Sequence, residues 1–157
     1  MFRIGKCHPI ASTNSVNMKE ILRLPIRLKI FSGSYILQSR RSGFNNVSQD
    51  STCLLCKCSE ETLSHFLLTC EKLDCVRTAV IPRIIEICSQ LFAKHKIVAN
   101  IDLLTLIVNP FYYCTQLSAK EFILDISNQL EPLCRCLCYR LHTKRYELLG
   151  ITVRGRY

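Results

Sequence analysis

The chain has 157 residues, 48% of them hydrophobic, and a formal net charge of +9. This length fits about one ordinary domain, or a small module joined to a helical one, and the low content of glycine and proline argues against a disordered chain. No apolar run reaches the roughly 20 residues that span a bilayer, and the first residues lack the apolar stretch of a secretory signal. We therefore expect an intracellular protein, nuclear or cytoplasmic, that is neither secreted nor bound in a membrane.

The eleven cysteines would indicate a disulfide framework in a secreted chain. Their number is odd, and several of them fall within apolar helical patterns. Because no secretory signal is recognised, we expect reduced thiols, some used for metal binding and others for packing.

Basic charge is concentrated at the two ends of the chain. Residues 1–50 carry eight lysines and arginines against two acidic residues, and residues 131–157 carry six against two, whereas the middle is close to neutral. Such ends attract polyanions, with nucleic acid, RNA or DNA, as the first expectation and an acidic membrane surface as the second. The alternative is that these side chains only keep the surface soluble.

The first third of the chain is predicted to contain a loose arm and then a basic helical segment. Residues 1–14 show no periodicity, whereas residues 15–48 carry apolar side chains at helical spacing with lysine and arginine between them. Pro25 either kinks this helix or starts a new one, and Gly33 should end it. The polar run 40–46 is interpreted as a connection to the next segment.

The basic helical segment carries candidate contacts to nucleic acid. Its cations are suited to phosphates, and its two aromatic side chains are suited to stacking on bases. The alternative is a solvated basic face beside two aromatic residues of the core. The candidates are Arg23, Arg27, Lys29, Tyr35, Arg40, Arg41 and Phe44.

Residues 49–77 hold the most informative pattern of the chain, C-x2-C-x8-H-x4-C. Two cysteines separated by two residues can turn tightly around one ion, and a histidine and a further cysteine can complete the tetrahedron of ligands that Zn²⁺ prefers. We therefore predict a structural zinc site that is closed by four protein ligands and has no metal-activated water. The expected ligands are Cys53, Cys56, His65 and Cys70, with Cys58 or Cys75 left open as a substitute for Cys56 or Cys70.

Local geometry sets a condition on this site. Ser59 is the expected N-cap of a helix that begins at Glu60 and carries His65 in its second turn. Cys70 lies five residues further on, about 500° around an ideal helix. The helix must therefore tighten or unwind near its end for both side chains to reach one ion.

Residues 78–157 are predicted to form a helical region with a basic tail. A series of apolar residues over 73–91 keeps helical phase across Pro82, which indicates one kinked helix or two nearly collinear ones. Asn100 is the expected N-cap of a short helix over 101–108, which the following Asn-Pro pair should end.

A last long helix is predicted to open at Ser118, to kink at Pro132 and to stop at Gly150. Three side chains share one face of this helix at a spacing of four residues: Cys134, Cys138 and His142. They are interpreted as buried packing residues rather than a second metal site, because no fourth ligand is evident. The predicted fold class is mostly α, helical with a small CCHC zinc-binding knuckle.

The residues around the expected ligands carry a resemblance to a known family. The run Gly33-Ser34-Tyr35-Ile36-Leu37-Gln38, then Arg41, Phe44 and Asn45, precedes the first two ligands, and Glu61-Thr62, Phe66-Leu67-Leu68 and Arg77 surround the other two. Over residues 20–80 this combination resembles the C-terminal segment of reverse transcriptases encoded by non-LTR (LINE-like) retrotransposons. The resemblance implies a CCHC zinc knuckle with the four ligands named above and a role in holding RNA or target DNA.

The same resemblance does not extend to polymerase chemistry. That family's polymerase needs paired aspartates to hold Mg²⁺, and this chain contains no Asp-Asp pair and is too short for a polymerase. We therefore expect a detached, non-catalytic piece rather than an enzyme. Two functions stay open: a zinc-dependent nucleic-acid-binding module, and a zinc-stapled module whose helical region docks a protein partner through the face between Leu130 and Leu141.

Overall fold

The computed structural model describes residues 8–11, 17–44, 50–114 and 120–151. These residues are mostly helical and form no β-strand, and a single isolated bridge within them pairs Thr52 with Glu60. The predicted fold class is confirmed. In chain order the elements are η1 (Pro9–Ala11), α1 (Met18–Phe31), α2 (Gln38–Phe44), η2 (His65–Thr69), η3 (Glu71–Leu73), α3 (Asp74–Lys94), α4 (Leu103–Val108), η4 (Pro110–Tyr113), α5 (Lys120–Asp125), η5 (Ile126–Leu130) and α6 (Glu131–Leu148).

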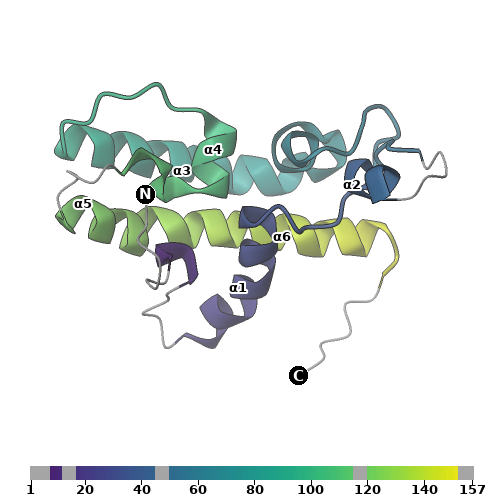
Figure 1. Ribbon diagram of the computed structural model, residues 1–157, viewed down its shortest axis with the longest axis horizontal. Helices are drawn as coiled ribbons and strands as arrows, with labels where there is room; N and C mark the ends of the chain where they lie inside the picture. The colour runs from purple at the N-terminus through teal and green to yellow at the C-terminus, as the bar shows by residue number, and fades with distance from the viewer. Residues whose placement is uncertain (1–7, 12–16, 45–49, 115–119, 152–157) are drawn as a thin grey trace.

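Two long helical rods set the shape of the molecule. Figure 1 shows α3 lying beside the continuous run of α5, η5 and α6, with the two rods pointing in opposite directions. The shorter α1 crosses α6 steeply and packs against it, while α3 packs against α6 along its length. The segment 50–70, which we call the knuckle, lies with α2 at the end where α3 begins and α6 ends.

One continuous hydrophobic core joins these elements. The apolar series predicted over residues 73–91 and the one predicted along the last helix are both buried. They pack on each other and on α1. The face between Leu130 and Leu141 belongs to this core and is not available to a protein partner. Among the described residues, no helix is both long enough and apolar enough to cross a membrane.

None of the three helical prolines ends the helix that contains it. Pro25 lies inside α1 and Pro82 inside α3, and both are exposed, so the carbonyl groups they leave unpaired are on the solvent side. Pro132 lies in the first turn of α6, directly after η5, which is a turn of π-helix. The wider π turn relieves the clash between a proline ring and the carbonyl four residues earlier, which explains why the rod continues.

Glycine ends both of the helices where this was predicted. Gly33 follows α1 with a φ of 68°, and Gly150 follows α6 with a φ of 65°, a left-handed conformation that favours glycine. The predicted cap at Ser118 and residues 1–7 and 12–14 of the predicted N-terminal arm lie outside the described residues.

Two other local predictions are wrong. Asn100 does not cap a helix; α4 begins later because the Asp102 carboxylate accepts the N–H of Thr105 at 2.7 Å. Residues 38–44 form a helix, α2, instead of an irregular connection. The reason for this helix lies in the knuckle, where the Glu61 carboxylate accepts the N–H of Gln38 at 2.8 Å.

Candidate metal centre

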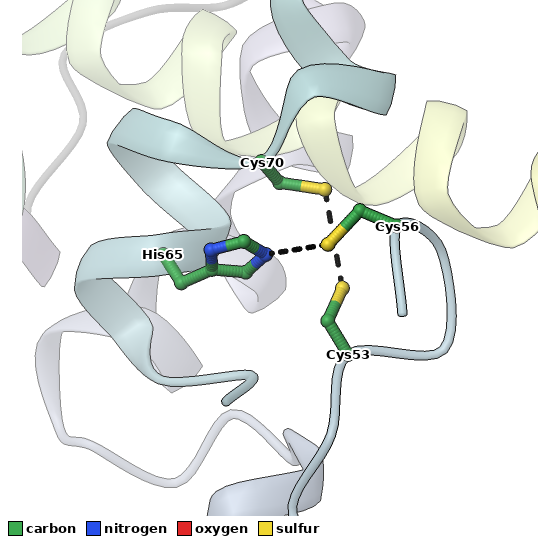
Figure 2. A group of neighbouring side chains, drawn as sticks. All are labelled: Cys53, Cys56, His65 and Cys70. Atoms are coloured by element: carbon green, nitrogen blue, oxygen red, sulfur yellow. Dashed lines mark hydrogen bonds between the residues drawn. The ribbon is translucent and has the colours of Figure 1, made fainter. Parts of the chain in front are cut away.

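The structure brings together the four side chains that the sequence spacing selected. One ligand atom from each of Cys53, Cys56, His65 and Cys70 lies within 4.8 Å of every other. The sulfur atoms of Cys53 and Cys70 are 3.9 Å apart, and the Cys56 sulfur is 3.3 Å from Nε2 of His65. Figure 2 shows the three sulfur atoms and the imidazole converging on one small region.

This spacing fits a tetrahedral metal ion. Bonds of about 2.3 Å from zinc to sulfur require edges of about 3.8 Å between the sulfur atoms of a tetrahedron. The observed distance of 3.9 Å between Cys53 and Cys70 is close to that edge. The donor set of three thiols and one imidazole is the set that zinc and other soft or borderline cations prefer.

A tight backbone reversal places the first two cysteines. The bridge between Thr52 and Glu60 closes a loop, inside which the N–H of Cys53 donates to the Ser59 carbonyl at 2.8 Å. The N–H of Lys57 in turn donates to the carbonyl of Cys53 at 2.9 Å, and Lys57 adopts a φ of 58° to complete the reversal. The two thiols of the C-x2-C pair therefore face the same point.

A π turn places the other two ligands. The helix begins later than predicted, since Thr62, not Ser59, accepts the N–H of His65 through its hydroxyl at 3.1 Å. From His65 to Thr69 the helix widens, and the N–H of Cys70 donates to the carbonyl of His65 at 2.8 Å, five residues back. The predicted need to unwind is thus met by a π turn, after which Cys70 leaves the helix with an extended backbone.

Hydrogen bonds from the backbone prepare Cys56 to ionise. Burial alone would raise the pKa of Cys56, but the N–H groups of Cys58 and Ser59 and the neighbouring thiols outweigh it and lower that pKa below its usual value. Burial raises the pKa of the Cys70 thiol to about 12, against a hydrogen bond from the N–H of Lys72. A divalent cation at the centre would deprotonate both thiols.

Two further side chains support the ligands without being part of the cluster. Nδ1 of His65 lies 3.1 Å from the Thr69 hydroxyl, which leaves Nε2 facing the sulfur atoms. The buried Arg77 guanidinium donates to the carbonyl of Cys70 and, at 3.4 Å, to that of Phe66, so it satisfies the end of the π turn. The same guanidinium also pairs with the Asp74 carboxylate at 2.6 Å.

The other cysteines of the described ranges lie outside this cluster. Cys58 and Cys75, the possible substitutes, are exposed, and the Cys58 thiol donates to the carbonyl of Cys56 instead. Cys134 and Cys138 are fully buried in the core, and Nδ1 of His142 lies 2.9 Å from the Tyr35 hydroxyl. All cysteines in the described ranges are free thiols, as expected.

The structure separates the seven candidate nucleic-acid residues into two groups. Arg27 is completely buried, and its guanidinium donates to Glu131 at 3.0 Å and to the carbonyl of Ile107 at 2.6 Å. Tyr35 is also buried and stacks on Phe66. Arg27 cannot reach a phosphate, so the prediction that it contacts nucleic acid does not hold, and Tyr35 is a side chain of the core rather than an exposed platform for stacking.

Four of the remaining candidates, all of them cations, lie at or near the surface. Arg23 is half-buried and pairs with Glu20 at 2.6 Å. The exposed cations are Lys29 in the last turn of α1 and Arg40 and Arg41 on α2. Phe44 is the last residue of α2.

The sequence patterns did not single out Glu61 as a residue with a role of its own. Its carboxylate is 1% exposed and accepts from Nε and Nη2 of Arg145 at 2.8 and 2.9 Å, as well as from Gln38. Glu61 therefore joins the knuckle to α6 and to the basic helix α2. The signal for it was weak, because Glu61 lies in a polar run, Ser59-Glu60-Glu61-Thr62, between two ligands.

A scan against protein-family models, a search of curated proteins and a search of solved structures found no match to this chain. The resemblance to the C-terminal segment of LINE-like reverse transcriptases therefore remains a prediction from the residues. What the molecule itself establishes is a helical fold with a Cys/His cluster that could hold a metal ion.

Proposed function

We propose that the chain is a zinc-stapled module that binds nucleic acid and performs no catalysis. The observation that carries this proposal is the closed cluster of three thiols and one imidazole, which matches the preferences of structural zinc. When bound, zinc would cross-link the two halves of the knuckle. The residues of the knuckle then hold α2 in place through Glu61.

The charge of the molecule supports nucleic acid as the partner. The net charge is +9, and two exposed arginines, Arg40 and Arg41, lie on the short helix that the knuckle positions. Lys29 is exposed at the end of α1, four residues before the Gly33 turn, which lies near Arg40. Cations on rigid elements hold a fixed geometry toward phosphates, and their contribution is sensitive to salt.

Metal content tests the first half of the proposal. We expect about one zinc per chain in the wild type, and loss of that metal on Cys56→Ser or His65→Ala. Cys58→Ser is the matched control, since Cys58 is an exposed cysteine two residues away that lies outside the cluster. A well-folded wild type that purifies without metal and takes up none from added zinc would refute the zinc assignment.

The salt dependence of binding tests the second half. Each phosphate contact contributes about 0.7 to 0.9 to the slope of log K against log salt. The double variant Arg40→Gln/Arg41→Gln should therefore flatten the slope for an RNA or DNA oligonucleotide by about 1.4 to 1.8. Arg83→Gln/Lys96→Gln removes the same charge from two exposed positions, one within α3 and one just after its end, and should leave the slope nearly unchanged.

Protein binding is a second candidate function, favoured by a different observation. An apolar hollow of about 240 Å³ lies between α3 and the residues leading into α4, and two exposed isoleucines, Ile85 and Ile101, line it. Binding of a protein there would be insensitive to salt and to the arginines of α2. Zinc-loaded protein that binds no RNA or DNA at low salt would favour this second function.

A further inference from the structure

A small pocket lies between the end of α1 and the basic helix α2. Its volume is about 140 Å³, and it is open to solvent. The buried side chains of Ile30, Tyr35 and Leu37 line its interior, and Leu63 of the knuckle adds a further apolar wall. The pocket therefore lies where the end of α1, the helix α2 and the knuckle meet.

The opening of the pocket is polar and positively charged. Ser39 and Arg40 of α2 line it, and Nη1 of Arg40 lies above the Gly33 turn, 3.9 Å from where a Cβ would be. The Glu61 carboxylate of the knuckle pairs with Arg145. The pocket thus combines an apolar interior with a guanidinium at its mouth.

The size and lining of the pocket suit one flat ring. A cavity of about 150 Å³ with apolar walls is large enough for benzene. A base that enters the pocket would place its flat faces against the apolar walls. Its phosphate would stay outside the pocket, with the negative charge beside Arg40. A base within a duplex is stacked and paired, so only an unpaired base can enter such a pocket.

We propose that this pocket takes one unpaired base of a single-stranded nucleic acid, with Arg40 holding the adjoining phosphate. This inference rests on the proposed function and specifies the form of nucleic acid that the module selects. The knuckle contributes a pocket wall through Leu63, so its fold and the base contact are linked.

The test compares three oligonucleotides by fluorescence anisotropy at one salt concentration: oligothymidylate of twelve residues, an abasic strand with the same number of phosphates, and a duplex of the same length. Stacking of one base contributes about 1–3 kcal/mol, so the wild type should bind oligothymidylate roughly tenfold more tightly than the abasic strand. Leu63→Phe, which fills the pocket, should remove this preference and leave binding of the abasic strand unchanged. Arg40→Gln should weaken the binding of both single strands, whereas the control substitution Arg83→Gln should leave the binding of both unchanged.

The outcomes separate this inference from the proposed function. No binding of any oligonucleotide at low salt would refute the nucleic-acid function itself. Equal binding of the oligothymidylate and abasic strands by the wild type would refute the base pocket and leave general phosphate binding intact. If the wild type binds the duplex as tightly as the oligothymidylate, this result too would refute the base pocket and leave general phosphate binding intact.

A second measurement keeps the test decisive if Leu63→Phe does not fold. In the wild type, the methyl NMR signals of Leu37 and Leu63 should shift when oligothymidylate is added and stay in place when the abasic strand is added. Signals that do not respond to either strand would refute the pocket. Signals that respond instead to an acidic peptide would assign the pocket to a protein ligand and overturn the proposal.

Discussion

Glu61 is a single side chain on which three separate segments depend. It belongs to the knuckle, its carboxylate forms two hydrogen bonds with Arg145 of α6, and it accepts the first N–H of α2. Ser39 adds a hydrogen bond from its hydroxyl to the Glu61 carbonyl at 2.8 Å. A carboxylate this deeply buried loses its hydration, so it is tolerated only because the Arg145 guanidinium and the Gln38 N–H donate to it.

We therefore expect Glu61→Gln to be strongly destabilising. The substitution leaves the buried Arg145 guanidinium without its counter-charge, which costs about 3–5 kcal/mol in comparable buried pairs. Urea unfolding followed by circular dichroism measures the effect. The neighbouring Glu60→Gln is the control, because that side chain is exposed and should change the free energy of unfolding by less than about 0.5 kcal/mol. Equal effects of the two substitutions would contradict this role of Glu61.

At the scale of elements, the π turn η2 determines which side chains can act on the metal centre. It places Thr69 beside the imidazole of His65, with its hydroxyl 3.1 Å from Nδ1. A hydrogen bond at Nδ1 fixes the orientation of the ring and leaves Nε2 free to bind metal. Thr69 is itself exposed, so its contribution lies in this contact rather than in packing.

Thr69→Val should therefore weaken metal binding without unfolding the protein. Loss of a hydrogen bond to a ligating histidine typically lowers metal affinity by about 10- to 100-fold. Thr69→Ser keeps the hydroxyl and should restore most of the affinity. Competition with a zinc-binding dye measures both variants, and wild-type affinity in Thr69→Val would show that the hydroxyl does not orient His65.

The two halves of the candidate site differed in how far sequence could predict them. The metal cluster was predicted because its four members lie within eighteen residues and their spacing alone constrains them. The helix α2 was missed because four of its seven residues, QSRRSGF, are serine, glycine or phenylalanine, which are weaker helix formers, and a contact with Glu61 from 23 residues further on stabilises it. The burial of Arg27 was also invisible, since its partner Glu131 lies 104 residues away.

At the scale of the whole molecule, one buried contact ties the basic segment to the central helix. Tyr35, in the connection between α1 and α2, lies with its hydroxyl 2.9 Å from Nδ1 of His142 on α6. Its ring stacks on Phe66 of the knuckle, with ring centroids 5.2 Å apart. Burial raises the pKa of Tyr35, so its hydroxyl stays protonated and can donate to a neutral His142.

This contact makes the stability of the fold depend on pH. Burial, with the positive charges of Arg145 and Lys29, lowers the pKa of His142 from 6.5 to about 4. The unfolded chain therefore binds the proton more readily than the folded one. The contribution of neutral His142 is fully present above pH 6.5, is lost as the pH falls from there toward 4, and changes little below that. The loss amounts to about 3 kcal/mol.

Urea unfolding at intervals between pH 7.5 and 4 tests this expectation in the wild type and in His142→Asn. An asparagine side chain accepts the Tyr35 hydrogen bond without titrating, so the variant should lose less stability across this range than the wild type does. Protonation of the cysteine ligands also contributes in acid, but it is common to both proteins and cancels in the comparison. Identical pH profiles would show that His142 titrates alike in the folded and unfolded chain, and the pH dependence would then belong to the metal centre.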